Sequence, residues 1–257
     1  MTEVFGPLAD LAGLGEIWLW PAFAVFLRVG AVMALAPGFG EQSVPMRIRL
    51  ALTLAFTATI LPAVAAGITP QPSLLGGAAE IASGLMLGAG LRLFIAALQM
   101  AGMIAAQSVS LSQLFAAAGA EPQPAIGNVL TLAGLALAMT AGLHVKLASL
   151  LILSYDLLPA GALPGSADAA AWGLARIAEA FGLAFSLAAP FVLGGAVYNL
   201  ALGMMNRAFP QLMVSFIGAP ALTAGGLVLL ALIAVPVLSI WMLAFDRFLL
   251  NPLGGIE

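Results

Sequence analysis

Two long uncharged, mostly apolar runs near the C-terminal end constrain this chain more than any other feature. The runs Ala180–Met205 and Leu212–Phe245 contain no Asp, Glu, Lys or Arg. The second run has 34 residues, about 51 Å as a helix, whereas the hydrocarbon core of a bilayer is about 30 Å thick. Unpaired backbone groups are not tolerated in hydrocarbon, so the runs predict helices. For the same reason, the polar break between them must lie at an interface or be buried in protein.

The composition extends this interpretation to the whole chain. Hydrophobic residues make up 63% of the 257 residues, charged residues make up 7%, and the mean hydropathy is +1.13, whereas an ordinary soluble domain is about one quarter charged. The sequence therefore predicts an integral membrane protein. The 11 acidic and 8 basic residues are scattered singly, which argues against nucleic acid as a partner.

Residue usage also limits the chemistry. The chain has no Cys and one His, which excludes disulfides, thiolate metal sites, Cys nucleophiles and a His cluster, and no cofactor is expected. Three acidic residues and no basic residue precede the first apolar run. We therefore expect no cleavable signal peptide, and insertion is expected to rely on the first helix itself.

Six apolar helical segments follow from the run lengths and their punctuation. The third is longer than one span needs, so it should be tilted, kinked or held in protein. Pro37 with Gly38 should end the first, Pro62 and the turn Gly67–Pro72 should close the second, and Pro220 and Pro236 should kink or interrupt the last. The predicted segments are Ile17–Ala36, Leu50–Ala66, Ile81–Gln107, Ile126–Leu143, Trp172–Met205 and Leu212–Phe245.

The connections complete this outline. Apolar sequence resumes at Leu147–Leu153, and the Pro-rich and Gly-rich stretch Ser154–Ala171 is the best candidate boundary in the chain. Residues 107–124 read as a loop of small residues and prolines, either packed inside an assembly or solvated. The basic loop residues divide equally between the two sides, so no membrane orientation is predicted.

Two arginines lie inside predicted helices. A charge at the centre of a membrane helix costs a few kcal/mol on insertion scales, so Arg28 and Arg92 each need a partner. Glu80 and backbone carbonyls of neighbouring helices are the candidates. A buried pair that holds helices together is favoured over a direct role in transport. Gly84 and Gly88, four residues apart, should let another helix approach closely.

The polar break identifies a family. Asn206-Arg207-x-x-Pro210-Gln211 between two long apolar helices, followed by Gly218-x-Pro220, resembles the FliR family of flagellar export-gate proteins, which has a counterpart in virulence injectisomes. The resemblance extends from about residue 26 to about residue 230. Its further motifs are Leu27-Arg28-Val29-Gly30, Pro37, Pro45-x-Arg47-x-Arg49, Glu80 with Gly84 and Gly88, Gln99 with Gly102 and Gln107, His144, and Ser154 with Pro159.

The chain departs from the family pattern at three points. Ser110 stands where the family usually has Gly, Glu121-Pro122 replaces a nearby Asp-Pro, and Leu143 replaces the Gly before His144. These departures concern the conformation of the loop rather than membership of the family.

The resemblance implies an all-α membrane fold and a non-enzymatic role. Residues 1–165 would be a FliP-like part and residues 166–257 a FliQ-like hairpin, together forming one integrated membrane domain. One copy would join FliP and FliQ homologues, with FlhB, in the flagellar basal body. This gate would pass unfolded proteins across the bacterial inner membrane. Residues 107–124 would plug it at rest, through Gln107, Ser110, Phe115, Glu121 and Pro122.

The resemblance also implies which residues make contacts within the assembly. Arg207 is expected to donate to carbonyls or carboxylates of a partner subunit in a fork geometry that Lys does not offer. The full set is Arg28, Pro37, Pro45, Arg47, Arg49, Glu80, Gly84, Gly88, Arg92, Asn206, Arg207, Pro210 and Gln211.

Two alternatives come from other functional classes. A secondary transporter places its binding site at broken helices, and Pro190, Pro220 and Pro236 fit this superficially, but no internal repeat with matching interruptions is present. An intramembrane serine protease would use Ser83 with His144, which requires hydrogen-bond reach between them. The injectisome counterpart of the gate is a third alternative within the same family.

Overall fold

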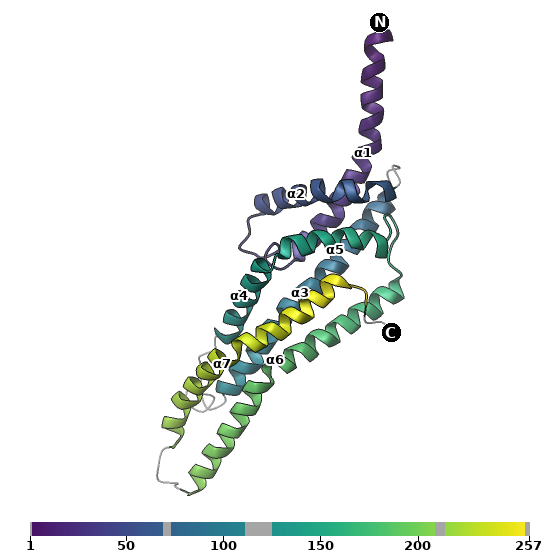
Figure 1. The fold of residues 1–257 in the computed structure, drawn as a ribbon. Helices are drawn as coiled ribbons and strands as arrows, with labels where there is room; N and C mark the ends of the chain where they lie inside the picture. Colours follow the sequence, from purple (N-terminus) through teal and green to yellow (C-terminus); the bar gives the residue numbers. More distant parts are fainter. Residues whose placement is uncertain (1, 69–72, 111–124, 209–213, 255–257) are drawn as a thin grey trace. The chain divides into compact units, whose positions relative to one another are not determined.

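The computed structural model describes residues 2–68, 73–110, 125–208 and 214–254, with side chains from residue 18 onward in these ranges except at 110, 125, 214–217 and 219. The described residues form helices and no strand (Figure 1), which confirms the all-α prediction. The elements are α1 (Thr2–Leu35), α2 (Met46–Val64), the 3-10 turn η1 (Ala65–Gly67), α3 (Leu74–Ser110), α4 (Ala125–Thr140), α5 (Leu143–Leu157), α6 (Ser166–Ala208) and α7 (Val214–Leu250).

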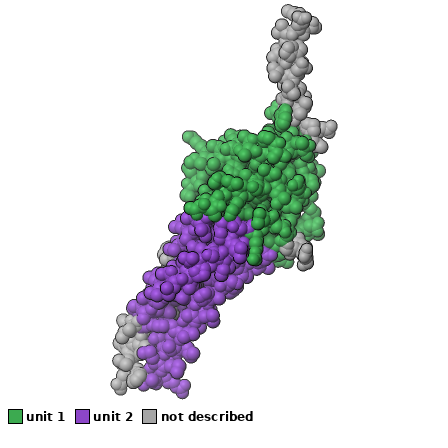
Figure 2. Space-filling view, in the orientation of Figure 1, with its two compact units in different colours: residues 1–92, 139–176, 247–257 green, residues 93–138, 177–246 purple. Residues whose placement is uncertain are grey.

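Two compact units share these helices. The first consists of residues 1–92, 139–176 and 247–257, and the second of residues 93–138 and 177–246 (Figure 2). The units therefore do not follow the predicted division at residue 165, because α3, α6 and α7 each contribute to both. Whether residues 1–165 and 166–257 correspond to two partner proteins stays a prediction.

Helices α1 and α3 run parallel through the first unit. Gly76 and Gly77 face Trp20 and Leu27, whereas Gly88, three turns further along α3, faces Leu35. Helix α2 packs on α1 and on α5. The buried stripe of α2 is Thr53, Thr57, Ile60 and Val64. Both threonine hydroxyls donate to the carbonyl four residues earlier, so the packed face of this helix leaves no hydroxyl unpaired.

The second unit contains a helical hairpin and an aromatic cluster. The hydroxyl of Tyr198 on α6 donates to the carbonyl of Gly218 on α7 at 2.9 Å, and the two helices lie side by side in Figure 1. Trp241 stacks on Phe245 with ring centroids 5.2 Å apart, and its indole N–H donates to the carbonyl of Phe94 at 2.9 Å. This indole is fully buried and paired, as a buried Trp requires.

The prediction of about six long apolar helical segments is confirmed. Five helices of the described part are long and apolar enough to cross a membrane, or six if α4 and α5 together make one span. The predicted fourth helix breaks after Thr140, because Gly142 adopts a left-handed φ of 79° that favours glycine. Helix α5 then continues to Leu157, so the connection before α6 is shorter than predicted.

Other predicted helix ends were also displaced. Helix α1 begins at Thr2, and α3 runs on to Ser110, through the first residues of the predicted loop. Pro62 lies in the last turn of α2, which ends at Val64 near the predicted end, whereas Pro220 and Pro236 lie inside α7 and do not interrupt it. A proline removes one backbone hydrogen bond, but long membrane helices tolerate this loss where neighbouring groups satisfy the freed carbonyl.

Candidate functional site: a buried ion pair joining α1, α3 and α5

Arg28 is the centre of a buried polar network in the first unit. It lies mid-way along the apolar part of α1 and is fully buried. Its Nε donates to Glu80 Oε2 at 2.7 Å, and one terminal nitrogen donates to Glu80 Oε1 at 3.2 Å. This is the two-pronged geometry that a guanidinium offers to a carboxylate. The predicted partner of Arg28 is therefore confirmed.

The end of α5 supplies the remaining acceptors. The second terminal nitrogen of Arg28 donates to the carbonyl and to the hydroxyl of Ser154, at 3.0 and 3.1 Å. The nitrogen that contacts Glu80 also donates to the carbonyl of Leu158 at 2.9 Å. A helix C-terminus carries free carbonyls and a partial negative charge. All five N–H groups of the guanidinium thereby have acceptors.

Glu80 is equally well paired. Besides Arg28, its carboxylate accepts from the hydroxyl of Tyr155 at 3.2 Å and from the backbone N–H of Gly161 at 2.8 Å. The Arg28 guanidinium carbon lies 3.8 Å from the centre of the Tyr155 ring, within cation–π range. Gly161 has a φ of 75°, so the connection between α5 and α6 bends there and brings its N–H to Glu80.

The magnitudes show why this pairing matters for α1. An Arg at the helix centre costs about 3 kcal/mol on insertion scales. On the same scales, the Leu, Phe and Val residues of the candidate span Trp18–Leu35 together favour insertion by about 2 to 5 kcal/mol. Helix α1 by itself is therefore close to balance between membrane and water. The residues that oppose the charge are Leu19, Phe23, Val25, Phe26, Leu27, Val29, Val32 and Leu35.

A second ion pair ties down the connection between α1 and α2. Arg92 on α3 donates to Glu41 Oε1 at 2.6 Å, and Arg49 on α2 donates to the carbonyl of Glu41 at 3.1 Å. The side chains of Arg92 and Glu41 are 38% and 24% exposed. The predicted need of Arg92 for a partner is thus met by a different acid from that of Arg28, at a partly exposed position.

The glycines of α3 bring this helix directly onto α1. A Cβ added to Gly84 would lie 2.5 Å from the carbonyl oxygen of Arg28 and 2.7 Å from the Cβ of Ala31. One added to Gly88 would lie 3.0 Å from Leu35 Cβ. The predicted close approach is confirmed, and its partner is a helix of the same chain. Contacts of these glycines with another subunit stay a prediction.

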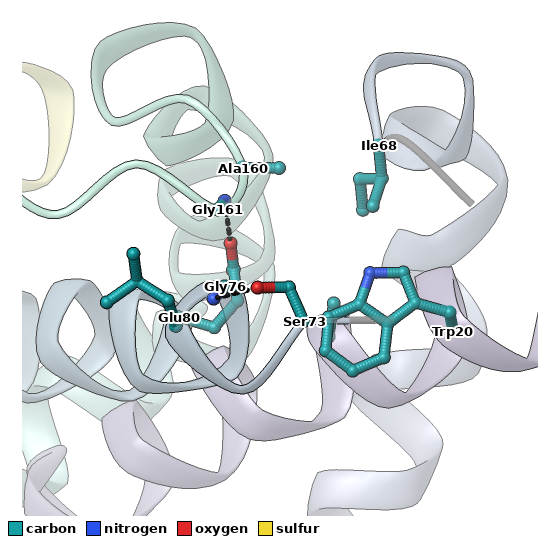
Figure 3. A pocket seen from close by; sticks show the side chains of 9 residues that line it. Trp20, Ile68, Ser73, Gly76, Glu80, Ala160 and Gly161 are labelled. Atoms are coloured by element: carbon teal, nitrogen blue, oxygen red, sulfur yellow. Dashed lines mark hydrogen bonds between the residues drawn. The ribbon is translucent and has the colours of Figure 1, made fainter. Parts of the chain in front are cut away.

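A pocket of about 190 Å³ adjoins the network at the start of α3. Ser73 is among the residues that line it, and Figure 3 shows Trp20 and Ile68 on one side and Glu80, Ala160 and Gly161 on the other, where the Gly161 N–H donates to the Glu80 carboxylate. The Ser73 hydroxyl accepts from the N–H of Gly76 at 3.3 Å, so Ser73 caps the start of α3. A neighbouring apolar groove between α1 and α3 shares Trp20 and Ser73 with this pocket.

The other predicted site residues lie apart from this network. Pro37 is buried, Arg49 is partly buried, and Pro45, Arg47, Gln107, Asn206 and Arg207 are exposed. Ser110 is the last residue of α3, and its side chain lies outside the described part. Phe115, Glu121, Pro122, Pro210 and Gln211 also lie outside the described residues.

The geometry that the serine protease alternative requires is not present in the described residues. Ser83 is fully buried and its hydroxyl oxygen has no hydrogen-bond partner. His144, at the start of α5, is exposed. The two side chains therefore do not form the hydrogen-bonded dyad that nucleophilic catalysis would use.

Sequence reasoning missed two members of the network, Tyr155 and Gly161. It marked the neighbouring Ser154 and Pro159 as family elements without assigning them a partner. A usable signal was present, because an apolar run that ends in Ser, Tyr and Asp offers helix-terminal carbonyls to a buried cation.

The fold and the network together define a class: an all-helical membrane protein whose apolar helices are joined by a fully paired buried charge. Comparison with known proteins is more specific. Residues 19–248 match the family described as "Bacterial export proteins, family 1". The chain is 34% identical over 237 residues to the flagellar biosynthetic protein FliR of Caulobacter vibrioides, covering 90% of this chain and 93% of that protein.

Two further relatives carry the same description. FliR of Escherichia coli is 31% identical over 227 residues, which is 84% of this chain and 83% of that protein. FliR of Bacillus subtilis is 29% identical over 225 residues, which is 82% of this chain and 85% of that protein. The chain therefore belongs to the FliR family of bacterial export proteins, as the resemblance predicted.

Proposed function

We propose that this chain is a non-enzymatic subunit of the flagellar type III protein export gate in the bacterial inner membrane. One copy assembles with FliP and FliQ homologues, contacts FlhB, and helps to pass unfolded flagellar proteins across the membrane. The observation that carries this proposal is the family match, which runs from residue 19 to residue 248. The relatives' shared name in flagellar biosynthesis favours the flagellar gate over its injectisome counterpart and over a small-molecule transporter.

The helix lengths support an assembled rather than an isolated subunit. Helix α6 has 43 residues and α7 has 37, about 65 and 56 Å in length, which exceeds the hydrocarbon thickness of about 30 Å. Large apolar side chains are exposed along α6, including Phe185 at 61% and Leu200 at 68%. Apolar helices of other subunits would pack on such a surface.

The proposal includes the assignment of the two chain segments. Residues 166–257 form the FliQ-like hairpin of α6 and α7, and residues 1–165 form the FliP-like part. Helix α6 begins at Ser166, which agrees with a boundary at that position. Residues 107–124 act as a plug in the resting gate, with the part from 111 to 124 lying outside the described residues.

The test is native mass spectrometry of the chain expressed together with FliP and FliQ homologues of the same bacterium. A hetero-oligomer that contains one copy of this chain is the expected result. A stable monomer or homodimer in the presence of both partners would contradict the proposal. A search for bound ions or small molecules in that species would then test the transporter alternative.

A further inference from the structure

We propose that the Arg28–Glu80 ion pair makes the membrane insertion of α1 depend on α3. This inference rests on the proposed membrane location of the chain. It changes the expectation from sequence, in which the first helix inserts by itself.

The first observation is that Arg28 finds no partner on its own helix. All the acceptors of its guanidinium belong to Glu80, Ser154 and Leu158, which lie 52 to 130 residues further along the chain. When α1 is made first, this charge faces either lipid or water. The apolar residues of α1 only about offset the cost, so α1 alone has no strong preference for the membrane.

The second observation is the geometry of the partner. Glu80 lies in the second turn of α3, and α3 runs parallel to α1 with Gly84 directly against the Arg28 backbone. The ion pair therefore forms only when both helices have their N-terminal ends on the same side of the membrane. In this way the orientation of α3 selects the orientation of α1. Helix α2 leads the chain back from the end of α1 to the start of α3.

The third observation is that the partners of Arg28 differ in charge. Ser154 and Leu158 offer carbonyl oxygens to Arg28, but only Glu80 neutralises its charge. The carboxylate in turn is 1% exposed and fully paired. Removing Glu80 leaves a buried positive charge, whereas removing both charges leaves only neutral polar groups, those of Ser154, Leu158, Tyr155 and Gly161, without these partners.

The experiment uses the full chain, which has no native Cys. A single Ser43→Cys change places a thiol in the exposed connection between α1 and α2. An impermeant maleimide then reports, in spheroplasts and in inverted vesicles, the fraction of chains that carry this thiol on each side. In the otherwise unchanged chain we expect labelling from one side only.

Glu80→Leu should raise the fraction labelled from the wrong side at least fivefold. The double variant Arg28→Leu with Glu80→Leu should return that fraction to within twofold of the starting chain, because the unpaired charge is gone. The matched control is Arg92→Leu, which breaks the other, partly exposed ion pair and should leave the labelling unchanged.

Normal labelling of the Glu80→Leu chain would overturn the inference, since α1 would then insert without its partner. Equal mislabelling of the single and the double variant would also overturn it, because the defect would follow the loss of Glu80 and not the unpaired charge. Labelling of the unchanged chain from both sides would overturn it as well, because the intact ion pair would then not fix the orientation of α1, whereas recovery of the chain in the soluble fraction would count against the membrane location itself. Failure of the proposed function is thereby distinguished from failure of the inference.

Discussion

At the residue scale, the helices of the first unit are positioned by close contacts as much as by charge. Gly84 has no space for a side chain, because the backbone of Arg28 lies against it. The same contact keeps the guanidinium of Arg28 within reach of Glu80, one turn earlier on α3.

The first prediction concerns this contact. Gly84→Ala should destabilise the protein by about 2 kcal/mol, because overpacking of a close contact typically costs about 1 to 3 kcal/mol. Thermal unfolding of the purified protein in detergent measures the loss. The control is Gly182→Ala on α6, where a Cβ meets no atom within 4 Å and the better helix propensity of Ala should leave stability equal or higher. Equal behaviour of the two variants would contradict this account of Gly84.

A buried hydroxyl gives the second prediction. Ser83 is fully buried and its hydroxyl is unpaired in the described structure, and an unpaired buried polar group costs about 1 to 3 kcal/mol. Ser83→Ala should therefore keep or raise the unfolding temperature. Swimming motility of the host should be unchanged, since we assign Ser83 no chemical role. Loss of motility at normal protein levels would instead support the alternative in which Ser83 is a nucleophile.

At the element scale, the sequence predicted the helices well and their ends poorly. Long uncharged runs determine that helices exist, because an unbroken apolar run in hydrocarbon satisfies its own backbone groups within the segment only as a helix. Their ends depend on local backbone choices, such as the left-handed Gly142 that divides α4 from α5.

The candidate site also has a part that the sequence predicts and a part that it does not. The Arg28–Glu80 pair was predictable because each charge in an apolar segment requires a partner. The carbonyls that complete it were not, because they belong to a helix end 126 residues away. Their position follows from tertiary packing, which no local pattern records.

The third prediction concerns the hairpin of α6 and α7. Tyr198→Phe removes the hydrogen bond to the carbonyl of Gly218 and keeps the ring. It should weaken closure of the hairpin by about 1 kcal/mol, seen as about fivefold faster amide exchange near residue 218. The control is Tyr155→Phe, whose hydroxyl bonds to Glu80 and whose loss should leave exchange near residue 218 unchanged. Equal exchange in Tyr198→Phe and the unmodified chain would show that this hydrogen bond does not hold the hairpin.

At the scale of the whole molecule, the exposed residues bear on assembly. Arg207 lies in the last turn of α6 and is exposed, and Arg247 occupies the corresponding place in α7. Their common chemistry and exposure make them a matched pair.

The fourth prediction uses this pair. Arg207→Ala should reduce co-purification with FliP and FliQ homologues at least tenfold, because a charged fork that contacts a partner is lost. Arg247→Ala should have little effect. An intact complex with Arg207→Ala would count against the contact role of Arg207.

The fifth prediction tests the proposed plug. Replacing residues 111–124 by a Gly/Ser linker of equal length leaves α3 and α4 as they are and should make the assembled gate conduct ions at rest. Planar bilayer recordings provide the measurement, with an equal replacement of residues 69–72 as the control. Unchanged conductance in the plug variant would remove this role.

The break at Gly142 has a consequence for the two ends of the chain. If α4 and α5 together cross the bilayer once, the described helices offer six crossings, and the residues before the first and after the last of them face the same compartment. If the pair enters and returns, the number is odd and these residues face opposite compartments. One backbone dihedral at a glycine thus sets the parity of the whole topology, and a tag at each end would report it.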